Sequence, residues 1–286
     1  MRQLGILQVL LSGFCFGFLG LFGKKAYELG LSPGEFLALR FLFASTGLGL
    51  FFLLRDRGRF RVGRVMATRA FLLGACGYAL FSTCYFTALK GLSVSLTVLL
   101  LYLFPVWVTI GARVFLGEKL TRWHLVALPL ALAGLVLLLW GELQIRDPAS
   151  LAFGIGASVV YSAYILTSRR FLAGVPPFSA AFFVMLGAAT TLSALHLRSV
   201  PQEPSVWLVV GATSLLSTIL AISLFLAGLQ KLGGAEASML SLAEPCTAVM
   251  IGFVVFGDQL LPPQWAGATL ILTGMMLTAL AKRSSS

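Results

Sequence analysis

Charged residues are scarce in this sequence. They make up 11% of its 286 residues, against roughly 25% in an ordinary soluble domain. Hydrophobic residues make up 58%, and the mean hydropathy is +0.95 over the whole length. This composition excludes a soluble fold and a large aqueous domain. Because a spanning helix takes about 20 residues, the chain has room for roughly ten spans with short connections.

Residues that build catalytic or metal sites are also few. The two histidines, His124 and His196, have no metal-ligand spacing. The four cysteines lie inside apolar runs, so they do not form an extracellular disulfide framework (Cys15, Cys76, Cys84 and Cys246). No Gly-rich nucleotide loop and no Ser/His/Asp arrangement is found. We therefore expect no enzyme activity, no metal and no cofactor, and no ATP-driven transport.

Apolar runs separated by charged, proline or glycine residues predict an all-α integral membrane protein with ten transmembrane helices. The expected spans are 4–23, 33–54, 69–89, 92–116, 123–140, 149–168, 177–197, 205–229, 235–257 and 263–281. The net charge of +11 does not indicate a nucleic-acid partner, because the basic residues fall between these runs. With an inside N-terminus, 15 basic residues face the cytoplasm and five face outward. We therefore expect both termini in the cytoplasm.

A repeat at a constant offset of 140 residues divides the chain. It pairs Leu89 with Leu229, Leu92 with Leu232, Pro105 with Pro245, Gly117 with Gly257, Glu118 with Asp258, Leu120 with Leu260 and Gly134 with Gly274. We expect a first five-helix repeat at 1–140, a second at 149–281 and a cytoplasmic tail at 282–286. Because the first repeat has an odd number of spans, the second repeat enters the membrane inverted relative to the first, as in alternating-access transporters.

Three segments resemble a known family. They are GLSPGEFLALRFLFA (Gly30 to Ala44), YFTALKGLSVSLTVLLLYLFPVWVTIGARVFLGEKL (Tyr85 to Leu120) and SLAEPCTAVMIGFVVFGDQL (Ser241 to Leu260). Together they are similar to EamA-type members of the drug/metabolite transporter superfamily. The resemblance implies ten helices and a central cavity lined mainly by spans 1 to 4 and 6 to 9. Members of that family export amino acids, including aromatic ones, or carry other metabolites and drugs.

Two prolines mark symmetric positions near the middle of the fourth and ninth spans. Pro105 and Pro245 each remove one helical hydrogen bond and free a carbonyl. They are hinge candidates for rocking one half against the other. The alternative is that each sets a fixed kink.

Glu244 is an acid beside Pro245 at the expected midplane, where a charge is costly unless it is paired, protonated or hydrated. Ser241 and Thr247, one turn away on each side, are expected to hydrogen-bond it. Three roles are open for Glu244: satisfying backbone groups, coupling protons, or contacting substrate.

Arg40 is a guanidinium about two turns into the second span. It suits a substrate carboxylate, or it reaches the interface or bonds helix-end carbonyls. The repeat does not place it beside Glu244. An intramembrane enzyme would need two such groups to converge.

Five of the six tyrosines fall inside spans, so their hydroxyls need partners within the bundle. The cavity candidates combine these rings with nearby hydroxyl and indole groups and the two ionisable residues: Tyr78, Ser82, Tyr85, Tyr102, Trp107, Tyr161, Tyr164, Ser217, Ser241, Glu244 and Arg40. A mostly apolar cavity with a few hydroxyls suits an amphipathic ligand. Hydrogen bonds between or along helices are the competing explanation, for Ser217 above all.

We interpret the chain as a secondary transporter of the cell inner membrane that exports small amphipathic metabolites, with amino acids, including aromatic ones, as the favoured substrates. Its partners are then a small-molecule substrate and membrane lipid, while the oligomeric state stays open. The main alternative is a carrier of a nucleotide- or sugar-derived solute or a drug, which would need more fixed cations than Arg40. A membrane scaffold is the remaining alternative and would not need two symmetric prolines.

Overall fold

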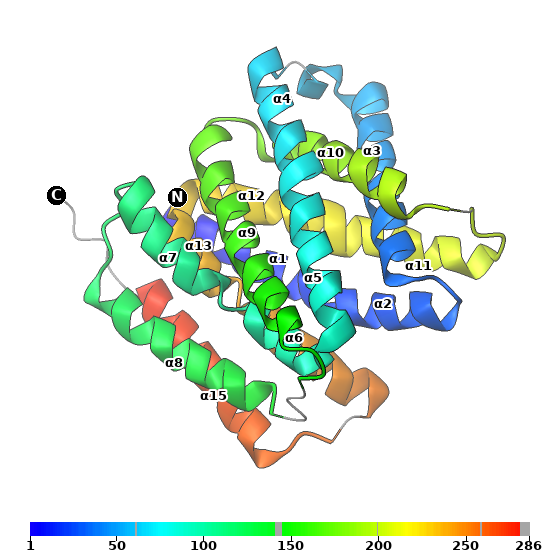
Figure 1. The fold of residues 1–286 in the computed structure, drawn as a ribbon. Helices are drawn as coiled ribbons and strands as arrows, with labels where there is room; N and C mark the ends of the chain where they lie inside the picture. Colours follow the sequence, from blue (N-terminus) through cyan, green and yellow to red (C-terminus); the bar gives the residue numbers. More distant parts are fainter. Residues whose placement is uncertain (61, 141–144, 199, 258, 281–286) are drawn as a thin grey trace.

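The computed structural model describes residues 1–60, 62–140, 145–198, 200–257 and 259–280 and is built from helices (Figure 1). Within these ranges, eight helical segments are long and apolar enough to cross a membrane, and Arg122–Leu138 is a shorter apolar helix. With Pro262–Leu280, the chain forms the ten expected rods. The proposed tail 282–286 and Asp258 of the repeat lie outside the described residues.

The elements of the first half are α1 (Arg2–Gly17), α2 (Leu19–Glu28), α3 (Pro33–Arg55), η1 (Arg57–Phe60), α4 (Arg64–Leu72), η2 (Leu73–Tyr78), α5 (Ala79–Gly91), α6 (Val94–Leu101), α7 (Phe104–Phe115) and α8 (Arg122–Leu138). Those of the second half are α9 (Ala149–Phe171), α10 (Pro177–His196), α11 (Pro204–Ser214), η3 (Leu215–Leu220), α12 (Ala221–Leu232), α13 (Gly234–Leu240), α14 (Ala243–Ile251), η4 (Gly252–Phe256) and α15 (Pro262–Leu280). The segments η2 and η3 are π-helical turns inside longer rods, and η4 is a π-helical turn at the end of the ninth rod.

Local sequence signals start several helices. Ser32 and Glu35 form a capping box at the start of α3, with Pro33 at its first position. Asp147 accepts hydrogen bonds from the Ala149 backbone N–H and the Ser150 hydroxyl at the start of α9. Hydrogen bonds to the ionised carboxylate, above all from Ser150, lower the pKa of Asp147.

Three rods are interrupted, which the hydropathy pattern does not predict. The first rod breaks at Phe18, between α1 and α2. The fourth breaks at Tyr102 and Leu103 and the ninth at Ser241 and Leu242, just before the two prolines. Pro105 and Pro245 therefore lie at the beginning of new helices rather than at a kink within one helix. The physical reason is that N–H groups in the first turn of a helix have no acceptor within the helix, so a proline there removes no helical hydrogen bond.

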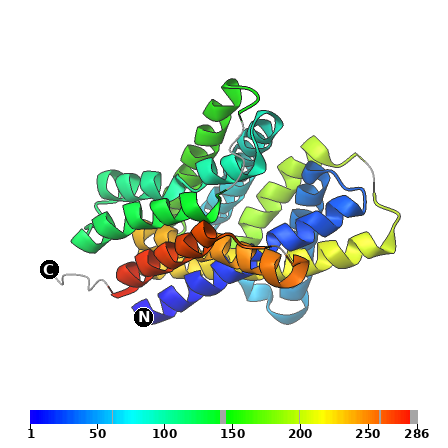
Figure 2. The same cartoon turned by 90° about the horizontal axis from the view of Figure 1, so that it is seen from below.

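Packing between the halves comes in matched pairs. Helix α1 packs on α12 and α14 of the second half, as α9 packs on α5 and α7 of the first. Helix α3 packs on α10, and α8 packs on α15 at one side of the bundle (Figures 1 and 2). The repeated glycines Gly117 and Gly257 share a left-handed backbone, with φ of 64° and 71°. This pairing is what a twofold relation between the repeats produces.

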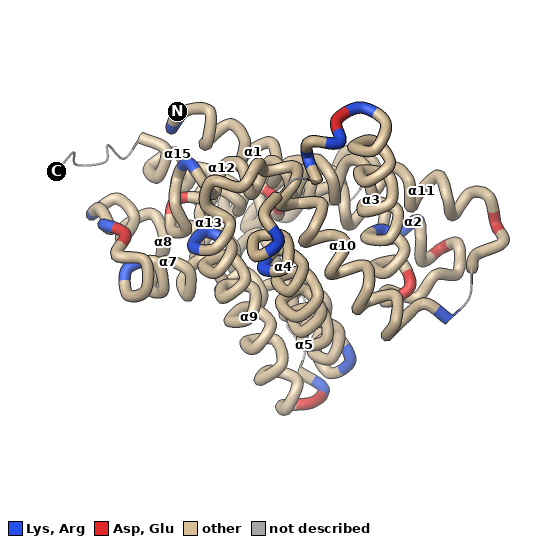
Figure 3. Tube along the Cα trace, turned by 90° about the horizontal axis from the view of Figure 1, so that it is seen from above, with Lys and Arg blue, Asp and Glu red and all other residues tan. Residues whose placement is uncertain are grey.

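Charged residues gather near the ends of the rods, and the rods are otherwise mostly uncharged (Figure 3). A close helix contact joins the two halves at Gly74 of η2 and Gly187 of α10. A Cβ at Gly74 would meet the Val184 carbonyl, and one at Gly187 would meet the Phe71 carbonyl. Glycine is therefore needed at both positions for the helices to approach this closely.

Candidate functional site

Arg40 is the most unusual buried side chain of the bundle. It is 1% exposed, and its Nη2 donates a 3.4 Å hydrogen bond to the Tyr78 hydroxyl. Its Cζ lies 4.7 Å from the centre of the Phe41 ring. Within the described part of the chain, Nε and Nη1 have no hydrogen-bond partner and no carboxylate pairs with the guanidinium. A cation buried in this way retains donors for an anionic ligand.

The backbone around Arg40 is held by a second helix. The Ser214 hydroxyl of α11 donates a 2.9 Å hydrogen bond to the Arg40 carbonyl. This bond ties α3 of the first half to α11 of the second, and the guanidinium itself is 1% exposed and bonded to Tyr78 inside the bundle. The expectation that Arg40 reaches the membrane interface is therefore wrong.

Five aromatic rings pack together beside Arg40, and we call them the central aromatic cluster: Tyr78, Phe81, Phe104, Tyr161 and Tyr164. Tyr161 lies at its centre, with ring centroids 5.2 Å from Phe81 and 4.9 Å from Phe104. The cluster joins α5 and η2 of the third span, α7 of the fourth and α9 of the sixth. It provides an apolar wall with phenolic hydroxyls.

Glu244 lies on α14, in the first turn after the break of the ninth rod. It is within side-chain hydrogen-bonding reach of Tyr102, and the Arg40 charge acts on it. The structure thus brings Arg40 and Glu244 to one region, which the repeat alone does not predict. The reason is that α2 packs on both α3 and α14.

The predicted partners of Glu244 are wrong. The Ser241 hydroxyl donates to the Ser238 carbonyl at 2.7 Å, and Thr247 donates to the Ala243 carbonyl at 2.8 Å. Both hydroxyls satisfy backbone of their own rod, which is common for Ser and Thr in apolar surroundings.

The other candidates divide between backbone bonding and contacts between helices. Ser82 donates to the Tyr78 carbonyl of its own rod, while Ser217 donates to the Cys15 carbonyl of α1, both at 2.7 Å. The Trp107 indole donates a 3.1 Å hydrogen bond to the Ser158 hydroxyl. Tyr85 packs on Phe81 at the edge of the central aromatic cluster, with ring centroids 6.1 Å apart. Ser82 and Ser217 thus hold helices rather than offer free hydroxyls.

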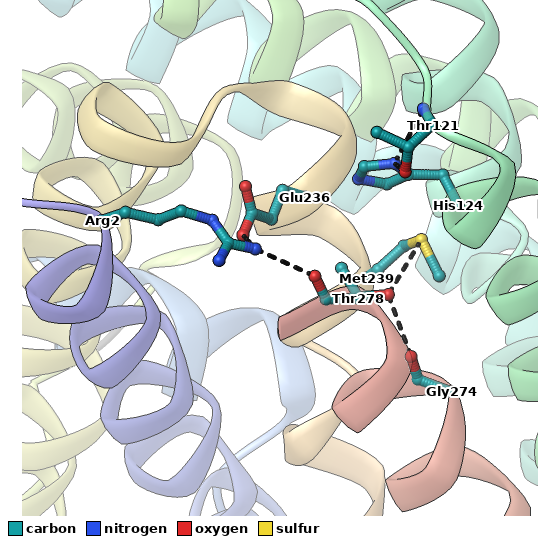
Figure 4. Close-up of polar contacts among 7 residues, drawn as sticks. All are labelled: Arg2, Thr121, His124, Glu236, Met239, Gly274 and Thr278. Carbon is teal, nitrogen blue, oxygen red and sulfur yellow. Dashed lines mark hydrogen bonds and ion pairs between the residues drawn. The ribbon is translucent and has the colours of Figure 1, made fainter. Parts of the chain in front are cut away.

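A second polar network lies at one end of the bundle, away from the central aromatic cluster. Arg2 Nη2 lies 2.7 Å from Glu236 Oε1, and it also donates to the Thr278 carbonyl at 3.1 Å (Figure 4). Glu236 is 4% exposed. The sequence patterns above do not identify it as a candidate residue. Its acidic side chain inside an otherwise apolar span was the available signal.

The described ranges contain no cluster of metal-ligating side chains. No group of three His, Cys, Asp or Glu side chains converges there. The arrangement around Arg40 is suited to binding. A buried cation, an aromatic wall and a nearby carboxylate together fit a small solute with both charged and apolar parts.

Comparison with known proteins identifies the family of this chain. The sequence profile of the EamA-like transporter family matches residues 3–140 and 149–280. The chain belongs to this family. EamA-like proteins are transporters of the drug/metabolite transporter superfamily, so this chain is a multi-pass membrane transporter.

Individual relatives agree with the family. The chain is 30% identical over 275 residues to a transporter of Archaeoglobus fulgidus, covering 96% of this chain and 95% of that one. It is 36% identical over 141 residues to the aromatic amino acid exporter YddG of Ancylobacter novellus, covering 47% and 46% of the two chains. A solved crystal structure superposes with a TM-score of 0.85 at 22% identity, over 97% of this chain and 96% of that one. That superposition shows that the two chains share a fold.

Proposed function

We propose that this EamA transporter exports small amphipathic metabolites, with amino acids, including aromatic ones, as the substrate class. Transport proceeds by alternating access around a midplane cavity between the repeats 1–140 and 149–281. The proposed setting is the inner membrane with cytoplasmic termini. The observation that carries the substrate class is the buried Arg40, with donors left over beside the central aromatic cluster.

The chemistry of an aromatic amino acid matches these groups. Its carboxylate would bind the Arg40 guanidinium through charge-assisted hydrogen bonds. Its ring would pack on Tyr161 and Phe104 with the offset or edge-on geometry that aromatic pairs prefer. The partial relative YddG supports this reading, since it is named an aromatic amino acid exporter.

Proteoliposomes that hold only this protein test the proposal. Vesicles loaded with unlabelled phenylalanine should take up labelled phenylalanine by exchange, and phenylalaninamide, which lacks the carboxylate, should compete poorly. Arg40→Gln should weaken phenylalanine competition roughly ten- to hundredfold, because hydrogen bonds to charged groups contribute about 1.5 to 3 kcal/mol. Arg113→Gln, on an exposed face of α7, is the matched control.

The same exchange assay can also reject the proposal. If folded protein exchanges none of a broad amino-acid panel, the amino-acid proposal is wrong. Screening nucleotide- and sugar-derived solutes in the same vesicles would then test the alternative carrier.

A further inference from the structure

Two cavities lie between α10 of the second half and elements of the first half, one against α3 and one against η1 and the start of α4. The first, which we call the α3–α10 groove, has a volume of about 530 Å³. Its walls include the exposed side chains of Leu50 and Leu53 on α3 and Thr190 on α10. The Thr190 hydroxyl donates to the Leu186 carbonyl at 2.8 Å, so its proton is already used within α10.

This groove lies within two spanning segments, Pro33–Arg55 and Pro177–His196. Water is absent from the hydrocarbon core of a bilayer, so an apolar groove on a spanning surface is filled by hydrocarbon. An acyl chain is the available occupant of that shape and chemistry.

The second cavity, which we call the Arg59 cavity, has a volume of about 600 Å³. It lies between η1, the start of α4 and the turn from α9 to α10, and Arg59, Gly63, Gly174 and Ser179 are among its lining residues. Ser179 is 0% exposed, and its hydroxyl has no hydrogen-bond partner within the described ranges. A buried hydroxyl of this kind is costly unless a ligand satisfies it.

Consecutive residues of η1 line the two cavities. Phe60 lines the α3–α10 groove, and Arg59 lines the Arg59 cavity. The Phe60 ring packs on Phe182 of α10, with ring centroids 5.3 Å apart. An amphipathic molecule that passes this aromatic pair would have its apolar part in the groove and its polar part at Arg59.

The protein around the Arg59 cavity carries excess positive charge. Residues 55–69 include five described arginines, Arg55, Arg57, Arg59, Arg64 and Arg69, and one acid, Asp56. Asp56 is paired with Arg59 through Nε at 2.9 Å, which leaves the terminal guanidinium nitrogens of Arg59 for a further anion. Clusters of four to eight basic residues beside a span are typical of anionic lipid recognition.

We propose that the α3–α10 groove and the Arg59 cavity together bind one anionic phospholipid. One acyl chain lies in the groove, and the phosphate accepts hydrogen bonds from Arg59 and Ser179. Because α3 and α10 belong to different halves, the bound lipid braces the contact between the two repeats. This lipid site is separate from the substrate region at Arg40, so it does not depend on the proposed substrate.

Native mass spectrometry of the full chain tests the proposal. The protein is purified and exposed to equal amounts of phosphatidylglycerol and phosphatidylcholine with the same acyl chains. Wild type should retain about one phosphatidylglycerol per chain. Arg59→Gln should lose this preference, whereas Arg122→Gln, an exposed arginine at the start of α8, should keep it.

A substitution that fills the α3–α10 groove is a second, independent test. Thr190→Trp should remove the retained lipid, because the larger side chain occupies the acyl-chain position. Thr273→Trp is the matched control, since Thr273 on α15 is also exposed and also bonds the carbonyl four residues earlier, at 2.8 Å. Phosphatidylglycerol should also raise the melting temperature of wild type more than phosphatidylcholine does, a readout that needs no variant.

Several results would overturn the lipid site. One is equal retention of the two lipids by wild type together with equal melting temperatures. Another is unchanged phosphatidylglycerol retention in folded Arg59→Gln or folded Thr190→Trp. Displacement of the lipid by soluble glycerol 3-phosphate at similar concentration would instead assign the Arg59 cavity to a soluble anion.

Discussion

Glu118 of the first half accepts hydrogen bonds from the start of α13 in the second half. The donors are the backbone N–H groups of Gly234, at 2.8 Å, and Ala235, at 3.2 Å. Arg169 Nε of α9 lies 3.8 Å from the same carboxylate. One acidic side chain thus joins the loop after α7 to two elements of the other repeat, and its negative charge is favourable beside a helix N-terminus.

Removing this carboxylate should destabilise the protein. Glu118→Ala leaves two N–H groups at the start of α13 without their acceptor, and we expect a loss of about 1 to 2 kcal/mol in the free energy of unfolding. Thermal melting in detergent measures the effect. Glu28→Ala is the control, because its exposed ion pair with Lys25 should contribute little. Equal melting temperatures for the two variants would contradict the role given to Glu118.

A methyl group at Gly187 should separate the halves. Gly187→Ala places a Cβ against the Phe71 carbonyl, and overpacking of this kind costs about 1 to 3 kcal/mol. Gly211→Ala is a matched control in another helix, since nothing lies within 4 Å of its Cβ position. Both changes gain the same helix propensity, so only Gly187→Ala should lower the melting temperature. A similar or higher melting temperature for Gly187→Ala would refute this close packing.

Glu244→Gln should leave transport nearly intact if Glu244 is mainly a structural partner of Tyr102, because glutamine still accepts a hydrogen bond. Both substrate exchange at equal pH and transport driven by a pH gradient should survive. Glu244→Ala should lower stability by about 1 to 3 kcal/mol, since it leaves a buried polar group without its partner.

Two different results would give Glu244 another role. A Gln variant that exchanges normally but cannot concentrate substrate would assign it to proton coupling. Weaker substrate binding by the Gln variant at every pH would indicate contact with a substrate amine.

Cysteine labelling tests the orientation. On a background without native cysteines, Gly58→Cys should resist an impermeant thiol reagent in intact cells, while Asp147→Cys should react. Both positions are exposed, so accessibility within the fold does not distinguish them. The expectation comes from the excess of basic residues on the side of residues 55–69. The reverse labelling pattern would place the termini outside.

Much of the architecture was predictable from the sequence because the bilayer imposes it. Unpaired backbone groups are not tolerated in hydrocarbon, so each long apolar run must be a helix. The ten rods follow from the apolar runs and their punctuation, and the 140-residue offset located both prolines and both left-handed glycines. Helix ends were less predictable: the third rod begins at Arg64, earlier than residue 69, because a helix does not have to stop where its apolar run does.

Side-chain partners were decided by the tertiary structure. Composition and spacing indicated that Arg40, Glu244, Ser217 and the buried tyrosines need partners inside the bundle, but they did not identify them. Ser217 bonds the Cys15 carbonyl, and Arg40 bonds Tyr78, through contacts between different rods. Hydropathy determines that a residue lies in the membrane, whereas the packing of α1 on α12 and of α3 on α10 determines which atoms meet there. Only that packing could bring Arg40, the central aromatic cluster and Glu244 into one region.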